Sequence, residues 1–194
     1  MSIEEDSQER RLIVQCQTGD LAAFERLYQA YSHDIYNMAL RIVLSEEIAE
    51  EVTQEVFISV YKDIRRFQFQ SAFTTWLYRI VYRRAADYFR KTRKHKNKLA
   101  LNWDETQDMI ETVKDEGPTP YEQLADKEQQ ETIHQLIQSL SPKHRAIIVL
   151  RYIKQYSYEE IAEILRCRLG TVKSRLNRAH KLLGELLRDG DILD

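Results

Sequence analysis

The stretch 157–183 carries cations between apolar residues, a combination that suits binding to a polyanion. In its second half, apolar residues recur at spacings of four, three and four, which places them on one face of a helix. These residues are Val172, Leu176, Ala179 and Leu183. The cations that fall largely outside this face are Lys173, Arg175, Arg178 and Lys181. A helix that buries one face and exposes cations on the other fits the major groove of duplex DNA.

A shorter helix is expected immediately before the cationic one. Ser157 and Glu160 stand three residues apart ahead of an apolar run, which is the spacing of a capping box. The inner face of this helix would be formed by Ile161, Ala162 and Leu165. Two short helices joined by a tight turn, the second rich in cations, predict a helix-turn-helix that binds DNA.

Aromatic and basic residues are interleaved in a second stretch, 67–98. Its aromatic residues are Phe67, Phe69, Phe73, Trp76, Tyr78, Tyr82, Tyr88 and Phe89. Its cations include Arg79, Arg83, Arg84, Arg90, Lys91, Arg93 and Lys94. Cations neutralise phosphates, and exposed rings can stack on unpaired bases for roughly 1–3 kcal/mol each. The stretch therefore suits single-stranded or partly melted DNA better than intact duplex.

The alternative for this stretch is that its aromatic residues fill a core and its cations are merely solvated. We expect such a core role for Phe73, Leu77, Ile80, Val81 and Tyr88. A second group falls close together on a helical wheel, and for it we favour the DNA-binding interpretation. This group is Trp76, Arg79, Arg83 and Arg90.

An acidic, amphipathic helix is predicted upstream of the aromatic stretch. Its exposed side would carry Glu47, Glu50, Glu51, Gln54 and Glu55. Such a surface is most often a solvated face, and the functional alternative is a docking site for a basic partner protein.

Charge is strongly segregated along the chain, although the net charge is only −2. Residues 79–98 carry nine Lys/Arg against one Asp, and residues 143–188 carry 11 against four acids. Between them, residues 99–132 carry two cations against ten acids. Two basic blocks separated by an acidic one indicate two polyanion-binding surfaces on two modules.

The helical periodicity and the small number of breakers, five Gly and three Pro, predict an all-α protein of two small helical domains. Asp20 and Ser45 are expected N-caps, and the pattern breaks at 67–70. Another helix start is expected at Thr119-Pro120. The predicted helices span 7–17, 21–43, 46–64, 71–93, 120–140 and 142–153, followed by the helix-turn-helix. The domains are then 7–95 and 119–188, joined by a flexible acidic linker, 96–118.

The expected inner face of the helix at 21–43 contains several large side chains. They are Phe24, Leu27, Tyr28, Tyr31, Ile35, Met38 and Ile42.

Enzymatic and metal-binding functions are disfavoured by the motifs that are missing. The two cysteines, Cys16 and Cys167, have no CxxC or Cys/His spacing, so we expect no metal site and no cofactor. No phosphate-binding glycine loop or Ser/His/Asp cluster is present, and the five histidines are scattered, so we expect no catalysis. The N-terminus does not resemble a signal peptide and no apolar run could span a membrane, so we expect a cytoplasmic protein without direct membrane insertion.

Taken in order, these segments resemble a bacterial RNA polymerase sigma factor of the extracytoplasmic-function group of the sigma-70 family. The segment AEEVTQEVFISVY resembles the polymerase-docking helix of sigma region 2. FQSAFTTWLYRI and ADYFR resemble its promoter-melting segment. LSPKHRAIIVLRYIKQYSYEEIAEIL and GTVKSRLNRAHKLL resemble sigma region 4. The resemblance covers about 10–95 and 120–188 and is specific through the order of its motifs.

The resemblance implies a factor that binds core RNA polymerase, selects promoters and helps to open the DNA. Docking on the polymerase would use Glu51, Gln54, Glu55 and Phe57. Capture of the melted minus-ten element would use Phe67, Phe69, Phe73, Trp76, Arg79, Arg83, Asp87 and Arg90. At the minus-thirty-five element, the expected base readers are Lys173, Ser174, Asn177 and Arg178. Further contacts there, mainly to phosphates, would come from Arg151, Arg168, Thr171, Arg175 and Lys181.

The family also implies a cognate anti-sigma factor, often membrane-anchored, and a role in a stress, envelope or metal response. Three positions depart from the family pattern. Arg168 stands where Pro is frequent, Arg83 where Asn is frequent and Glu51 where Asp is frequent. Arg83 and Arg168 leave the base preferences open.

Two other classes of function remain at this stage. A duplex-DNA regulator would use the C-terminal module alone, with the N-terminal helices sensing a signal or dimerising. The aromatic-basic stretch argues against it, because such a regulator has no need to hold melted strands. A purely structural adaptor is disfavoured by the two basic blocks.

Overall fold

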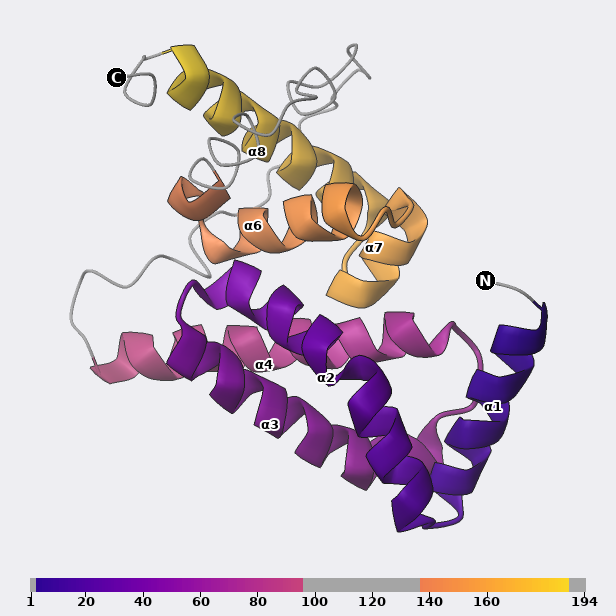
Figure 1. Ribbon diagram of the computed structural model, residues 1–194. Helices are drawn as coiled ribbons and strands as arrows, with labels where there is room; N and C mark the ends of the chain where they lie inside the picture. The colour runs from indigo at the N-terminus through magenta and orange to yellow at the C-terminus, as the bar shows by residue number, and fades with distance from the viewer. Residues whose placement is uncertain (1–2, 96–136, 189–194) are drawn as a thin grey trace. The chain divides into compact units, whose positions relative to one another are not determined.

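The computed structural model describes residues 3–95 and 137–188, and every regular element within these ranges is a helix (Figure 1). This confirms the all-α prediction. The chain divides into two compact units, Met1–Ala85 and Ala86–Asp194, with the boundary inside helix α4 (Phe73–His95). The predicted linker and most of the predicted helix at 120–140 lie outside the described residues.

The N-terminal unit is built from three helices and a short turn before α4. They are α1 (Ile3–Gln17), α2 (Leu21–Val43), α3 (Glu46–Asp63) and the 3-10 helix η1 (Ile64–Arg66). The first helix begins four residues earlier than its predicted start. The predicted 46–64 helix ends one residue early, at Asp63, and the chain continues as η1. The predicted break at 67–70 is confirmed, since no helix includes those residues.

Both predicted caps are present at the starts of α2 and α3. The Asp20 Oδ1 accepts a hydrogen bond from the backbone N–H of Ala23 at 3.1 Å, and the Ser45 Oγ accepts one from Ile48 at 3.5 Å. These bonds satisfy backbone donors that the first turn of a helix leaves without partners. The α2 helix then ends at Leu44, which adopts the left-handed conformation with φ 59°.

The core of the N-terminal unit is formed by the apolar faces of all four helices. Its fully buried side chains include Ile13, Leu27, Ile35, Met38, Ile42, Val56, Val60, Leu77 and Val81. The prediction for Tyr28 is wrong, because this side chain is 46% exposed. It lies at the edge of the α2–α3 contact, where it packs against Phe57 at 4.6 Å between ring centroids. Its amphipathic ring can remain at the surface with one side covered.

The C-terminal unit contains the predicted helix-turn-helix. Its described helices are α6 (Pro142–Ile148), the π-helix η2 (Val149–Ile153), α7 (Tyr158–Leu165) and α8 (Leu169–Arg188). The predicted inner face of α8 is confirmed, since Val172, Leu176, Ala179 and Leu183 are all buried. The widening of the last five residues of the 142–153 helix into a π-helix was not predicted.

The capping box that opens α7 is also confirmed. The Ser157 Oγ accepts from the Glu160 backbone N–H at 3.3 Å, and the Glu160 carboxylate accepts from the Ser157 backbone N–H at 2.8 Å. At the other end, Arg166 ends α7 in the left-handed conformation with φ 50°. This geometry makes the turn between α7 and α8 short.

A buried arginine holds the start of α6 to the end of the preceding segment. Arg145 is only 1% exposed, and its Nη1 donates to the backbone carbonyls of Gln138 at 3.0 Å and Leu140 at 2.7 Å. Burial lowers the pKa of the guanidinium to about 10, so the group is still charged at neutral pH. Charged donors make the stronger hydrogen bonds, and these carbonyls would otherwise face an apolar interior.

We predict that Arg145→Met lowers the free energy of unfolding by about 2 kcal/mol or more, because two carbonyls lose a charged donor. Arg166→Met changes the same residue type at an exposed position and should shift it by less than about 0.5 kcal/mol. Chemical unfolding followed by circular dichroism measures both. Equal effects of the two substitutions would contradict the role given to Arg145.

Candidate nucleic-acid interface

An aromatic cluster forms where the loop 67–72 leads from η1 into α4. The ring of Phe67 lies 4.9 Å from Phe69, 5.5 Å from Phe73 and 5.3 Å from Trp76, measured between centroids. Phe67 and Phe73 are 6% and 2% exposed, whereas Phe69 and Trp76 are half-buried. The two buried rings therefore support the two that reach the surface. As they stand, Phe67 and Phe73 have no open face for a base.

Phe69 has an unusual backbone conformation. Its φ of 56° lies in the left-handed region, which costs a non-glycine residue roughly 1–2 kcal/mol. The ring is covered on one side by the guanidinium of Arg10, 4.4 Å from its centroid, and packs on Phe67. Such strain persists only where the surroundings enforce it, and it concentrates at functional sites.

The cations of α4 do not form one uniform basic surface. Arg83 is exposed and Arg79 is half-buried. Arg90, also exposed, forms an ion pair with the half-buried Asp87 three residues before it. The two predicted site residues Asp87 and Arg90 are thus brought together, and the carboxylate orients the arginine.

Arg84 is half-buried against α3. Its Nε and Nη2 donate to the Ser59 Oγ at 3.0 and 2.6 Å, and its Nη1 lies 3.9 Å from the Glu55 carboxylate. Ser59 in turn donates to the Glu55 backbone carbonyl at 2.6 Å. This network joins α4 to α3, so Arg84 contributes to packing between helices.

The exposed face of α3 contains the predicted acidic residues and two apolar residues that sequence reasoning missed. Glu51, Gln54 and Glu55 are exposed. Ile58 and Tyr61 are 47% and 54% exposed. Ile58 follows Gln54 by four residues, and Tyr61 follows it by seven, so a helical wheel would have revealed them. Exposed apolar side chains beside acids are typical of a protein-binding face.

The Phe57 side chain lies beneath this face. It is 6% exposed, and its ring packs against Tyr28 at 4.6 Å and Phe24 at 6.4 Å. Phe24 also contacts Tyr61 at 5.1 Å. Phe57 therefore supports the surface residues of α2 and α3 from inside.

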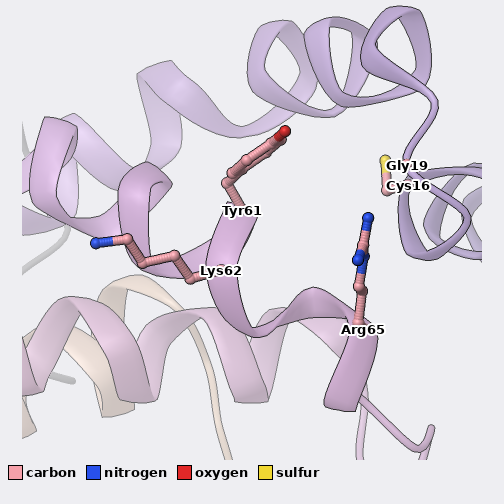
Figure 2. A pocket seen from close by; sticks show the side chains of 5 residues that line it. All are labelled: Cys16, Gly19, Tyr61, Lys62 and Arg65. Atoms are coloured by element: carbon pink, nitrogen blue, oxygen red, sulfur yellow. The ribbon is translucent and has the colours of Figure 1, made fainter.

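A small pocket lies near the α1–α2 turn and the end of α3, lined by Cys16, Gly19, Tyr61, Lys62 and Arg65 (Figure 2). Its volume of about 230 Å³ is below the range typical of ligand sites. The guanidinium of Arg65 reaches toward Cys16 and Gly19, whereas Lys62 points away from it (Figure 2). Burial, with a smaller contribution from Asp20, raises the pKa of the Cys16 thiol against an opposing effect of Arg26. The thiol therefore stays protonated and weakly nucleophilic at neutral pH.

The exposed side of α8 carries a row of polar residues at intervals of four. Lys173, Asn177 and Lys181 are exposed, and Arg168 is exposed just before the helix begins. Thr171, Arg175 and Arg178 are half-buried beside this row. The row matches the face that would meet a DNA groove.

Ser174 differs from that row because its side chain is buried. It is 4% exposed, and its Oγ donates to the Thr171 backbone carbonyl at 3.1 Å. The expectation that Ser174 reads a base does not fit this burial, because a side chain closed off from solvent cannot reach a base edge. The spacing did not predict this burial, because Ser174 is two residues from both Val172 and Leu176 and the helical period places it on the other side of α8.

Arg151, on the π-helix, is held by two contacts near the start of α7. Its Nη1 donates to the Tyr156 carbonyl at 3.1 Å, and its guanidinium lies 5.1 Å from the centroid of the Tyr158 ring. On the same π-helix, the Tyr152 hydroxyl and the His180 Nε2 share a hydrogen bond of 2.7 Å that reaches α8. The π-helix thus contacts both helices of the motif. Short π-helical segments are frequent at functional sites.

In the described ranges no three His, Cys, Asp or Glu side chains come together in a way that could hold a metal ion. Likewise, none of the helices described in these ranges is long and apolar enough to cross a membrane.

Comparison with known protein families assigns both units. Sigma-70 region 2 matches residues 27–95, and sigma-70 region 4 matches residues 130–183. The chain is 34% identical to the ECF RNA polymerase sigma factor SigW of Bacillus subtilis (strain 168) over 181 residues, which is 93% of this chain and 97% of the relative. It is 33% identical to the RNA polymerase sigma-H factor of Pseudomonas aeruginosa over 192 residues, 93% of this chain and 94% of the relative.

Solved structures share the fold at lower sequence identity. CnrH, in complex with the cytosolic domain of CnrY, superposes with a TM-score of 0.62 at 21% identity, covering 94% of this chain and 98% of that chain. The sigma factor RpoE of Bartonella quintana, in complex with the anti-sigma factor NepR, superposes with a TM-score of 0.60 at 21% identity. The match covers 86% of this chain and 98% of that chain.

We predict that Phe67→Ala lowers the free energy of unfolding by about 3–5 kcal/mol, because it empties the middle of the aromatic cluster. The exposed neighbour Gln68 provides the control, and Gln68→Ala should stay within about 0.5 kcal/mol of the parent protein. Urea unfolding followed by circular dichroism compares the two. A loss below about 1 kcal/mol for Phe67→Ala would show that this ring does not hold the aromatic cluster together.

Proposed function

Because this chain belongs to the extracytoplasmic-function group of RNA polymerase sigma factors, we propose that it binds core RNA polymerase, directs it to specific promoters and helps to open the DNA for initiation. The observation that carries this proposal is the presence, in one chain, of an aromatic cluster in region 2 and a cationic recognition helix in region 4. The working domains are 7–95 and 119–188, with 96–118 between them. As a transcription regulator, the protein leaves the chemistry to the polymerase.

Docking on core polymerase is assigned to the exposed face of α3. Glu51, Gln54 and Glu55 supply polar contacts, and Ile58 and Tyr61 supply apolar area to be buried. Phe57 acts from beneath by fixing the surface rings of α2 and α3. This division assigns the direct contact to residues whose side chains reach solvent.

Capture of the melted minus-ten element is assigned to the aromatic cluster and to α4. The surface rings of Phe69 and Trp76 can stack on unpaired bases, while Phe67 and Phe73 hold them in place. Arg79, Arg83 and the Asp87–Arg90 pair lie along α4 and supply polar and phosphate contacts. Pulling a base from the stack costs a few kcal/mol, and the rings and cations together offset that cost.

The minus-thirty-five element is assigned to the exposed row of α8. Asn177 suits a bidentate contact to adenine, Arg178 suits one to guanine, and Lys173 extends the same face. Phosphate contacts fit Arg168, Thr171, Arg175 and Lys181. Arg151 is fixed by Tyr156 and Tyr158 and would meet phosphate only with its remaining donors.

Regulation by a cognate anti-sigma factor completes the proposal. Of two solved structures of the same fold, RpoE is in complex with the anti-sigma factor NepR, and CnrH is in complex with the cytosolic domain of CnrY. A membrane-anchored partner would keep the protein inactive until a stress, envelope or metal signal releases it. The site of action is then the cytoplasm, where core polymerase and promoter DNA are found.

We predict that the chain, added to core polymerase, yields transcripts from a defined subset of a promoter library, and that Trp76→Ala impairs opening of those promoters. The open complex should fall about 10-fold, consistent with one stacking contact of roughly 1–3 kcal/mol. Permanganate footprinting of thymines near the start site measures opening, and His33→Ala, at an exposed position on α2, is the control. Unchanged thymine reactivity in Trp76→Ala would show that the Trp76 ring does not bind the melted strand. Absence of promoter-specific transcripts with the unaltered chain would refute the function itself.

The docking face gives a second prediction. Glu51→Lys should weaken binding to core polymerase about 10-fold or more, because it places a cation where the partner is expected to be basic. Glu25→Lys makes the same charge change at an exposed position of α2. It should leave the affinity for core polymerase within about twofold of that of the unaltered chain. Glu55 is a poorer choice, since it also lies 3.9 Å from Arg84. Fluorescence anisotropy of labelled protein titrated with core polymerase measures both, and equal affinities would reject this face.

A further inference from the structure

The helix α1 contacts the start of the loop 67–72. It does so although the region 2 family match begins only at residue 27. The contact is made by Gln17, the last residue of α1. Its Nε2 donates one hydrogen bond to the backbone carbonyl of Ile64 at 3.0 Å and another to that of Phe67 at 2.7 Å. A single amide group thus joins α1 to a segment about fifty residues away.

The two carbonyls bonded by Gln17 lie where the chain passes from η1 into the loop 67–72. Ile64 begins η1, and its carbonyl also accepts the Phe67 N–H at 3.0 Å. Phe67 follows η1 and is the first residue of the loop 67–72. A side-chain amide has two N–H donors, and both are used here. The bonds fix the direction in which the chain leaves η1, and with it the position of the Phe67 ring.

Further contacts from α1 reach the same aromatic cluster. The Arg10 guanidinium covers the ring of Phe69, and Arg10 precedes Gln17 by seven residues, which places both on one face of α1. Glu9 accepts a hydrogen bond from the Tyr31 hydroxyl, and the Tyr31 ring packs on Phe73 at 5.4 Å. Both contacts restrain rings of the cluster from its α1 side.

We propose that Gln17 is a positioning residue for capture of the melted minus-ten strand, with Arg10 assisting it. This inference rests on the proposed function. By fixing the Ile64 and Phe67 carbonyls, Gln17 holds the loop 67–72 in its strand-binding shape before DNA arrives. Arg10 holds Phe69 in its left-handed backbone conformation. A loop ordered in advance avoids the entropy cost of ordering on binding, so the strand binds more tightly.

The test uses the full chain with core polymerase and a promoter selected by the unaltered chain from a library. Gln17→Met keeps the length of the side chain and removes both donors. Gln8→Met makes the same change at an exposed position of α1 and is the matched control. Arg10→Met alters an exposed side chain, so it tests the inference even if Gln17→Met is poorly folded.

Three quantities are measured for each variant: thermal stability, affinity for core polymerase, and the rate of open-complex formation by permanganate reactivity. The same rates are taken on promoters carrying single substitutions in the minus-ten or minus-thirty-five element. For Gln17→Met we expect opening to slow about 5-fold or more and discrimination between minus-ten bases to weaken, as the loss of an ordered loop predicts. Arg10→Met should show a smaller loss of the same kind. Minus-thirty-five discrimination and core affinity should remain those of Gln8→Met.

The outcomes separate this inference from the function on which it rests. Unchanged opening rates and minus-ten discrimination in Gln17→Met and Arg10→Met, with transcription by the unaltered chain intact, would overturn the role of α1 alone. A loss spread equally over both promoter elements and core affinity would also overturn it, because it would show a general structural defect. Absence of promoter-directed transcription by the unaltered chain would overturn the proposed function and this inference together.

Discussion

The burial of Phe67 is the constraint on which the N-terminal unit depends. The chain must leave η1, turn, and enter α4 while presenting two aromatic rings at the surface. It does so by placing Phe67 inside, in contact with Phe69, Phe73 and Trp76. The apolar area removed from water at this point offsets the strained backbone of Phe69. The rings assigned to the melted strand owe their positions to a residue that solvent barely reaches.

Cations in this protein divide into those that build the fold and those that reach solvent. Arg84 joins α3 to α4 through Ser59, Arg145 satisfies two carbonyls ahead of α6, and Arg151 is held beside α7. The guanidinium group suits such roles because its donors can bond several acceptors at once while the charge is retained. Exposed positions such as Arg83, Lys173 and Lys181 keep their charge available to a polyanion. A basic block in the sequence therefore overstates the cationic surface that the fold presents.

The α3 helix shows how one element can serve two purposes. Its inner face, with Val52, Val56 and Val60, belongs to the core. Its outer face combines acids with Ile58 and Tyr61, which would remain exposed unless a partner covered them. Exposed apolar residues cost little stability by themselves, so their retention next to the acids fits a surface that is buried only in a complex.

Within the described residues, the sequence by itself determined most of the helices, three of their N-caps and the identity of the family, because these depend on residues close together in the chain. Asp20, Ser45 and the Ser157–Glu160 pair cap the helices that they were expected to cap, and the apolar spacing of α8 defined its inner face. Local spacing also identified the aromatic stretch and placed Phe73 inside, but it did not predict that Phe67 is buried or that Tyr88 is only half-buried. The tertiary structure alone decided that Phe57, Phe67 and Ser174 are buried and that Arg84 bonds to Ser59 of α3. It also brought Gln17 to the Phe67 carbonyl, a pairing across fifty residues. A helical period fixes the face on which a residue lies, but only the packing of distant elements decides whether that face is covered.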